Sequence, residues 1–393
     1  MKKAIFKKVT AGILALTAAA VLPGCQTGGK QSGGSTSSAD TPIKIGVVVP
    51  LTGQVSTFGQ SAKKGIELLE EETNSAGGIN GRKVDFLIQD DEGKAATAVT
   101  VGQKLITSDK VAAIVGPLTS TDANSLAPIC QQAGVPMVTG TGTNINITKA
   151  GDYIFRTCFI DPFQGQVMAK FAAEDLKAKN AAVLYNVGDD YSKGLAQAFI
   201  ESFTSKGGTI VDKETYNTGD KDFNSQLTKI AAKKPEVLFL PEYYSDVAVI
   251  AREARSANVT ATFLGGDGWD SAQLFSIGGE SVNGGYFSNH YAADDTSKEV
   301  VDFIKAFKAK YNGEVPDAMA ALNYDAAKVL LQCIKKANGT DAVKIRDALK
   351  NYDGTVVSGH IKFNSDRDAV KAAVIIKTVD GQEKFFQKIQ PDT

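Results

Sequence analysis

Residues 43–59 read IKIGVVVPLTGQVSTFG, and this stretch decides the fold class. Residues 43–50 are rich in β-branched side chains and carry a single charge. A short, continuous apolar run of this kind is typical of a strand that is buried on both faces of a parallel sheet. A helical pattern follows over 61–74 and ends at Gly77 and Gly78. A buried strand followed by a helix is the repeating unit of an α/β fold.

The same alternation continues outward from this stretch. The first series has predicted strands at 83–89, 111–115, 135–139 and 153–156, and helices at 94–108 and around 123–130. The second series has predicted strands at 181–186, 208–214, 236–240 and 261–265, and helices at 163–178, 191–206, 223–233 and 246–257. A helix-rich region at 296–351 precedes predicted strands near 361–364, 371–378 and 384–389. Each series is typical of an open, doubly wound sheet with helices on both faces.

Charge and composition exclude several classes of function. The 393 residues contain 43 Lys and Arg and 44 Asp and Glu, but four of the lysines lie within residues 1–8. Without them the count is 39 against 44, a net charge of −5, so nucleic acid is not expected as a partner. The sequence has two histidines and no GxGxxG, GxxxxGK[ST], GxSxG or HExxH motif. We therefore expect a protein without catalytic residues, metal or cofactor.

The N-terminus is predicted to be a targeting segment. Residues 1–24 combine lysines with an apolar run at 9–22, as in a signal peptide. The sequence Leu-Pro-Gly-Cys at 22–25 resembles a bacterial lipobox, and the Gly- and Ser-rich residues 25–42 are expected to form a flexible tether. We expect an extracytoplasmic protein that is anchored to the bacterial cell membrane by a lipid on Cys25. An ordinary signal peptide, with Cys25 incidental, is the alternative.

The three later cysteines are predicted to be buried thiols. Cys130 and Cys333 lie in predicted helices, and none of the three lies in a CxxC motif. A disulfide between Cys130 and Cys158 stays open as an alternative, although an odd number of cysteines leaves at least one unpaired in a monomer.

The segments that follow the predicted strands are candidate binding loops, because open α/β sheets bind ligands beyond the carboxyl ends of their strands. In the first series these segments contain glycines and hydroxyl groups at a helix start, with Ser120 and Thr143 as donors. A helix N-terminus with such donors suits a small anion such as a carboxylate. In the second series they contain aromatic residues and the carboxylate of Asp267, which suits an ammonium group. A ligand with both groups is an α-amino acid.

Each of these residues also has a purely structural interpretation. Ser120 could simply cap a helix, Thr141 and Thr143 could belong to an ordinary turn, and Asp267 could be a turn residue. Tyr243 could be a core aromatic, and Trp269 could serve packing alone. The placement of these residues after successive strands favours the binding site.

The motifs in their order resemble the type I solute-binding proteins of ABC transporters, in particular the leucine/isoleucine/valine-binding branch. The matching segments are IKIGVVVPLTGQVSTFG, GGINGRKVDFLIQDDEG, IVGPLTSTD, GVPMVTGTGTN, YSKGLA, EYYSD and FLGGDGWD. The resemblance runs from about residue 43 to residue 388. It implies two Rossmann-like doubly wound lobes, joined by a three-segment hinge, that close over a ligand. The first lobe would comprise 43–161 plus 290–368, and the second 162–289 plus 369–393.

The resemblance also implies roles for individual residues. The ligand carboxylate would bind Ser120 and Thr143, and the ammonium group would bind the Thr141 carbonyl, the Thr143 hydroxyl and Asp267. Phe58 would cover the ligand side chain, Leu118 would form a pocket wall, and Tyr191 and Tyr243 would close over the ligand from the second lobe. Trp269 departs from the family pattern and is a bulky residue expected at the ligand, where it could fill the pocket.

The implied function is capture of an amino acid, branched-chain or otherwise apolar, and its delivery to an ABC permease in the membrane. Two alternatives stay open: binding of another small ligand, such as an amide or an aromatic carboxylate, and ligand sensing for a partner receptor.

Overall fold

The computed structural model describes residues 41–391, so the predicted signal peptide, Cys25 and nearly all of the predicted tether lie outside the described residues. Strand β1 (Ile43–Val49) is buried along all of its length except Lys44. It lies inside a parallel sheet of order β2-β1-β3-β4-β5, which explains its continuous apolar run. The other strands of this sheet are β2 (Val84–Asp90), β3 (Ala113–Val115), β4 (Met137–Thr139) and β5 (Ile154–Arg156).

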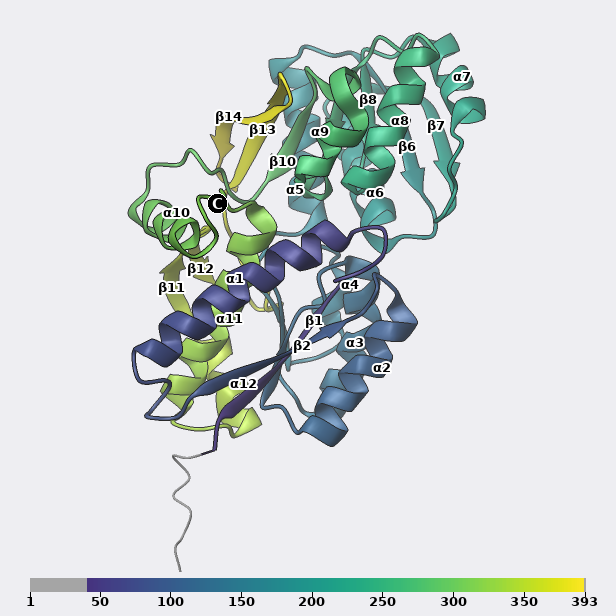
Figure 1. The fold of residues 1–393 in the computed structure, drawn as a ribbon. Coiled ribbons are helices and arrows are strands. Elements are labelled where there is room, and N and C mark those ends of the chain that lie inside the picture. Colours follow the sequence, from purple (N-terminus) through teal and green to yellow (C-terminus); the bar gives the residue numbers. More distant parts are fainter. Residues whose placement is uncertain (1–40, 392–393) are drawn as a thin grey trace, which may run out of the picture. The chain divides into compact units, whose positions relative to one another are not determined.

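We call the part of the molecule built on this sheet lobe 1. Helices α1 (Ser56–Ser75) and α11 (Ala318–Ala337) pack together on one face of the sheet, and α2 (Ala95–Lys104) and α3 (Ser120–Ala133) cover the other (Figure 1). Gly65 of α1 permits the close approach of α11, because a Cβ atom at this position would lie 2.2 Å from the Ala320 carbonyl oxygen. The smaller elements of lobe 1 are α4 (Asn146–Lys149), α10 (Lys298–Lys310), α12 (Ala342–Lys350), β11 (Asp353–Val356) and β12 (Gly359–Lys362).

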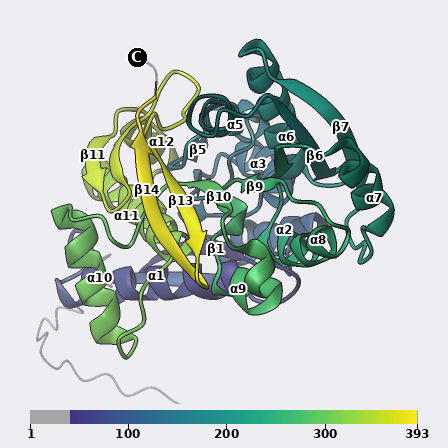
Figure 2. The same ribbon diagram turned by 90° about the horizontal axis from the view of Figure 1, so that it is seen from above.

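Lobe 2 is built on a second sheet, of order β14-β13-β10-β9-β8-β6-β7. Its strands are β6 (Asn180–Asn186), β7 (Thr209–Tyr216), β8 (Val237–Leu240), β9 (Thr262–Gly265), β10 (Tyr286–Asn289), β13 (Ala373–Val379) and β14 (Gln382–Ile389). Strands β6 to β10 are parallel, whereas β13 and β14 form an antiparallel hairpin beside β10 (Figure 2). The hairpin therefore adds the end of the chain to a sheet that the middle of the chain began.

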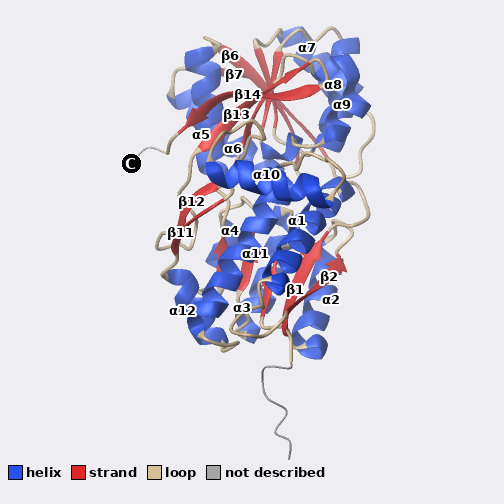
Figure 3. Cartoon of the chain, turned by 60° about the vertical axis from the view of Figure 1, so that its left-hand side comes forward, coloured by secondary structure: helices blue, strands red, loops and turns tan. Residues whose placement is uncertain are grey.

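Helices cover both faces of the second sheet as well (Figure 3). One face packs against α5 (Asp161–Lys170) and α6 (Asp190–Ser205). The other packs against α7 (Asn224–Lys233), α8 (Tyr244–Ser256) and α9 (Ala272–Gly278). The chain passes between the lobes after β5, after β10 and between β12 and β13. Two doubly wound lobes joined by three segments confirm the predicted fold class.

The differences from the sequence prediction lie mainly in short elements. Strands β10 and β11 and helices α4 and α9 were not predicted, and α1 begins at Ser56 rather than at residue 61. The predicted disulfide alternative is wrong, because Cys130, Cys158 and Cys333 are free and buried. Among residues 41–391, no helix is both long enough and apolar enough to cross a membrane.

Candidate functional site

A narrow cavity lies between the two lobes and is lined by residues that follow strands of both sheets. Its volume is about 20 Å³. The structure brings together seven of the nine sequence-predicted ligand residues at this cavity, and Thr143 and Trp269 are the two that do not line it. The lining residues are Phe58, Leu118, Thr119, Ser120, Thr141, Tyr191, Tyr243, Asp267, Gly268 and Met319.

The lobe 1 side of the cavity is the start of helix α3. Thr119 caps this helix, and its side chain accepts a hydrogen bond from the Asp122 N–H group. Ser120 is the first helical residue, and its Oγ accepts a hydrogen bond of 3.2 Å from the Asn144 N–H group. Thr141 Oγ1 donates to the Leu118 carbonyl at 2.8 Å. The first N–H groups of a helix lack intrahelical acceptors, so this edge of the cavity suits an anion.

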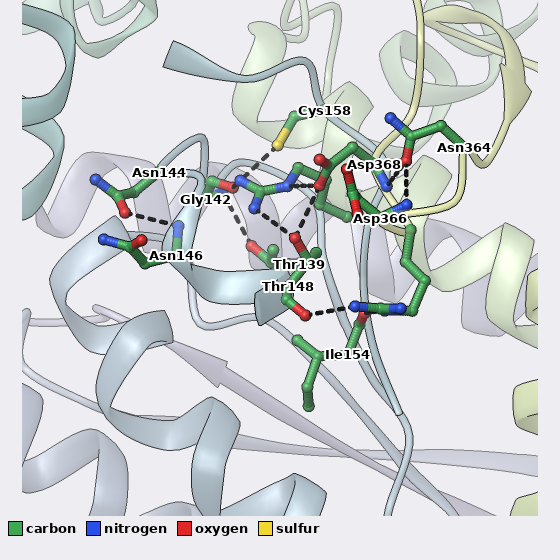
Figure 4. Close-up of polar contacts among 12 residues, drawn as sticks. Thr139, Gly142, Asn144, Asn146, Thr148, Ile154, Cys158, Asn364, Asp366 and Asp368 are labelled. Atoms are coloured by element: carbon green, nitrogen blue, oxygen red, sulfur yellow. Dashed lines mark hydrogen bonds and ion pairs between the residues drawn. The ribbon is translucent and has the colours of Figure 1, made fainter. Parts of the chain in front are cut away.

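The loop that carries Thr141 and Thr143 is held from behind by a buried ion pair. Arg156 is fully buried and pairs with Asp368, which lies on the segment between β12 and β13. Its guanidinium also donates to the Gly142 carbonyl at 2.8 Å and to Thr148 Oγ1 at 3.1 Å. Figure 4 shows Gly142, Thr148 and Asp368 converging at this point. Thr143 itself is buried, and its Oγ1 has no hydrogen-bond partner among the described residues.

The lobe 2 side of the cavity presents the carboxylate of Asp267. This residue opens a 3-10 turn directly after β9 and is 3% exposed. Its N–H group donates to Gln164 Oε1 at 2.8 Å, and its Oδ2 lies 3.0 Å from His290 Nε2. Its Oδ1 has no partner within the described part of the chain. A buried carboxylate oxygen without a donor is costly, so Oδ1 is suited to accept from a ligand.

Aromatic and aliphatic side chains form the rest of the wall. Tyr191 and Tyr243 stack with their ring centroids 5.1 Å apart, and Phe58 meets Tyr243 edge-on at 6.0 Å. The Tyr191 hydroxyl is held in place by the Gly268 N–H group, which donates to it at 3.0 Å. Leu118 and Met319 complete an apolar surface that suits an apolar ligand side chain.

The structure corrects the prediction that Trp269 fills the pocket. Its side chain is fully buried in lobe 2, where its Nε1 donates to the Leu240 carbonyl at 2.9 Å and its ring packs on Phe287. Trp269 and Asp267 are two positions apart in a 3-10 turn, and residues at this spacing point in different directions. The structural interpretation of Trp269 therefore holds.

Two polar residues near the site were not found by sequence analysis. Asp161 is 1% exposed, its N–H group donates to the Thr143 carbonyl at 3.0 Å, and neither of its carboxylate oxygens has a partner among residues 41–391. Burial raises the pKa of Asp161 well above its usual range, and the nearby charge of Asp267 raises it further. Asp161 opens α5 shortly after β5, and His290 follows β10, so the rule that loops after strands bind ligands applies to both.

A cluster of buried carboxylates lies where the lobes touch. Lobe 1 contributes Asp91 and Asp122, and lobe 2 contributes Asp189, Glu242 and Asp246. Hydrogen bonds cross between the lobes here, since Thr121 Oγ1 donates to Asp189 Oδ2 at 2.8 Å and the Gln54 amide donates to Asp246. Burial raises the pKa of Asp91 to about 6 and that of Asp122, which also faces the charge of Asp91, to about 7.

These raised pKa values predict that the folded protein loses stability as the pH rises. The unfolded chain releases the protons of Asp91 and Asp122 near pH 4, whereas the folded state keeps them up to about pH 6 to 7. Their contribution to stability is therefore full below about pH 4, falls as the pH rises and is lost above about pH 7. Asn cannot ionise, so the Asp122→Asn variant does not lose stability in this way. Relative to the wild type, its free energy of unfolding should be higher at pH 8 than at pH 5 by about 1–3 kcal/mol. Urea unfolding at both pH values measures this, with the exposed Asp175→Asn as control. An equal effect of Asp122→Asn at both pH values would contradict it.

Two doubly wound lobes that are joined by three segments, with a cavity between them, are the architecture of a solute-binding protein. The family described as "Periplasmic binding protein" matches residues 42–383. The chain belongs to this family, whose members are solute-binding proteins.

Individual relatives agree with this assignment. The Leu/Ile/Val-binding protein homolog 3 of Brucella melitensis is 35% identical over 311 residues, which are 78% of this chain and 83% of that protein. The leucine-, isoleucine-, valine-, threonine- and alanine-binding protein of Pseudomonas aeruginosa is 31% identical over 334 residues, which are 84% of this chain and 88% of that protein.

Solved structures show the same fold. The leucine-binding protein LivK of Thermotoga maritima has a TM-score of 0.85 and 36% identity, and the match covers 89% of this chain and 99% of that chain. LivJ of Streptococcus pneumoniae, a branched-chain amino acid transporter substrate-binding protein in complex with isoleucine, has a TM-score of 0.84 and 31% identity, over 89% of this chain and 100% of that chain.

Proposed function

We propose that this protein is the extracytoplasmic solute-binding component of an ABC importer and that it captures an α-amino acid with a branched or otherwise apolar side chain. The observation that carries this proposal is the pairing of a helix start with a buried, half-satisfied carboxylate across one cavity. The relatives whose names refer to leucine, isoleucine and valine support the same class of ligand.

The proposed contacts divide between the two lobes. The ligand carboxylate accepts hydrogen bonds from the start of α3, Ser120 and Thr143. The ammonium group donates to Asp267 Oδ1, to the Thr141 carbonyl and to Asp161, whose carboxylate ionises beside a cation. The ligand side chain packs against the apolar wall formed by Phe58, Leu118, Tyr191, Tyr243 and Met319.

Ligand entry requires the lobes to move apart. A cavity of about 20 Å³ has room for little more than a water molecule, which is far smaller than a leucine. Bending of the three connecting segments would break contacts such as Thr121–Asp189 and open the cavity. Closure then removes the ligand from water and strengthens both of its charged contacts.

The remaining parts of the chain have proposed roles that follow from the same function. Residues 1–24 direct export, and residues 25–42, with a lipid on Cys25, tether the protein to the membrane that holds the permease. The proposed lobe boundaries are 43–161 plus 290–368 and 162–289 plus 369–393. The protein releases its ligand unchanged to the permease.

Calorimetric titration of the purified protein tests the proposed ligand class. We expect heat and one bound molecule per chain with at least one of L-leucine, L-isoleucine and L-valine. We expect no heat with L-glutamate or L-lysine, because Asp267, the proposed partner of the ammonium group, is the one charged residue among the described residues that line the cavity. Native mass spectrometry of the protein as purified would identify a retained ligand directly. If no common L-amino acid gives heat or a thermal shift, the proposal fails.

A further inference from the structure

We infer that His290 is a positioning residue that holds Asp267 in place for the ligand ammonium group, and that it thereby sets the preference for amino acids over the same acids without the amino group. This inference rests on the proposed function and deepens it. His290 belongs to the segment that leaves lobe 2 after β10, so it joins the binding site to a connection between the lobes.

The imidazole ring of His290 is held by stacking on one face and by a hydrogen bond at its edge. The side chain is fully buried. The ring stacks on Phe159 with a centroid distance of 3.5 Å and an interplanar angle of 20°. Its Nε2 lies 3.0 Å from Asp267 Oδ2. A ring held in this way can orient the carboxylate that it contacts.

The hydrogen-bond pattern defines which nitrogen of the His290 ring carries the hydrogen. A carboxylate can only accept, so Nε2 carries the hydrogen and donates it to Asp267. Burial lowers the pKa of His290 to about 4, although the hydrogen bond and the charge of Asp267 oppose the shift. The imidazole is therefore neutral near pH 7. Its Nδ1 is the acceptor nitrogen, and it has no partner in the described chain.

A neutral donor leaves the negative charge of Asp267 available to the ligand. A lysine or arginine at the same distance would neutralise Asp267 and remove its attraction for an ammonium group. His290 instead occupies one oxygen, Oδ2, and leaves Oδ1 unpartnered. Without this donor the carboxylate could rotate about its terminal torsion, which is broad for Asp.

The backbone of Asp267 is held separately, so the contribution of His290 can be isolated. The Asp267 N–H group donates to Gln164 Oε1 at 2.8 Å, and the Ser288 hydroxyl donates to the same oxygen at 2.8 Å. Loss of His290 would therefore free the carboxylate and leave the main chain of Asp267 anchored. The expected effect concerns the ammonium group of the ligand and leaves its carboxylate contacts at α3 intact.

The test compares L-leucine with 4-methylpentanoate, which is the same acid without the amino group. The variant His290→Phe keeps an aromatic ring on Phe159 but removes the donor, and His290→Gln keeps an N–H donor. We expect His290→Phe to lower the ratio of the two affinities by about 10- to 100-fold, mainly through weaker binding of leucine, and His290→Gln to restore part of it. The exposed His360→Phe is the control and should not change the ratio.

The outcomes separate the inference from the function on which it rests. If His290→Phe leaves the ratio of the two affinities unchanged, as it would by weakening both ligands equally, His290 is only a packing residue and the inference is wrong. If the wild-type protein binds no amino acid, the proposed function itself fails.

A measurement on the wild-type protein covers the case in which His290→Phe does not fold. The chain has two histidines, so their ¹⁵N resonances are readily assigned. We expect His290 to be neutral with its hydrogen on Nε2 at pH 7 in the leucine-bound protein. An imidazolium ring or a hydrogen on Nδ1 would overturn the inference.

Discussion

Replacing Asp267 by Asn should weaken the binding of a branched-chain amino acid by about 2–5 kcal/mol, which corresponds to roughly 30- to 5000-fold in Kd. Asp267 Oδ1 is buried and unpartnered, and it is the proposed acceptor for the ligand ammonium group. The amide of Asn keeps the shape of the side chain and removes its charge. The variant therefore leaves the ammonium group inside a closed cleft without its counter-charge, where water cannot compensate.

Calorimetry on both proteins measures this loss, and Asp175→Asn, an exposed change of the same chemistry on lobe 2, should leave Kd unchanged. Unfolding curves should accompany the titrations, so that a loss of folded protein is not taken for a loss of affinity. If Asp267→Asn binds its ligand as tightly as the wild type does, no ammonium group is bound there. The ligand would then be a carboxylate of another kind, such as an aromatic acid.

Replacing Arg156 by Met should reduce the free energy of unfolding by about 3–5 kcal/mol. Arg156 is fully buried, and its removal takes the positive charge away from the carboxylate of Asp368 and the guanidinium donor away from the Gly142 carbonyl. Among the described residues, only the neutral Thr148 hydroxyl and the Cys158 thiol remain as donors to these two groups. The penalty comes from the uncompensated buried charge more than from the lost attraction. Because Gly142 lies between Thr141 and Thr143, ligand affinity should fall together with stability.

Urea unfolding measures this change, and Arg346→Met is a matched control. Arg346 also pairs with carboxylates, Asp152 and Asp347, but at the surface, where the loss should be at most about 1 kcal/mol. In the double variant Arg156→Met with Asp368→Asn, the second change should cost less than it does alone, because the unpaired charge is gone. Equal losses for Arg156→Met and Arg346→Met would show that the buried pair has no special role.

The sequence was sufficient for the fold because the first strand of each lobe, β1 or β6, lies in the interior of its sheet. Strand β1 pairs with β2 and β3 and is buried on both faces, so it must be apolar throughout, and such a run is easily recognised. Strand β10 has four residues, Tyr-Phe-Ser-Asn, and two of them are polar. Its place in the sheet depends on pairing with β9 and β13, which is information that a local pattern does not contain.

Several residues that line the cavity were predicted because the strands before them were recognised. Ser120, Thr141 and Asp267 follow strands that were recognised, and the structure places all three at the cavity. His290 follows a strand that was not recognised. Asp161 follows a recognised strand, but only a three-dimensional arrangement shows that its carboxylate is buried beside the site and lacks a partner. The direction of the Trp269 side chain depends on a 3-10 turn of three residues, which is too short to leave a periodic pattern.

The addition of β13 to the edge of β10 has a consequence for how the chain folds. Residues 286–289 pair with residues 374–377, and the whole of α10, α11, α12 and the β11–β12 hairpin lies between them. Closing so long a loop is slow. Lobe 1 likewise cannot be completed before α11 packs on α1. During synthesis neither lobe can be completed until nearly the entire polypeptide is available. A nascent chain with this property stays unfolded for longer, and this would suit the proposed export across a membrane before folding.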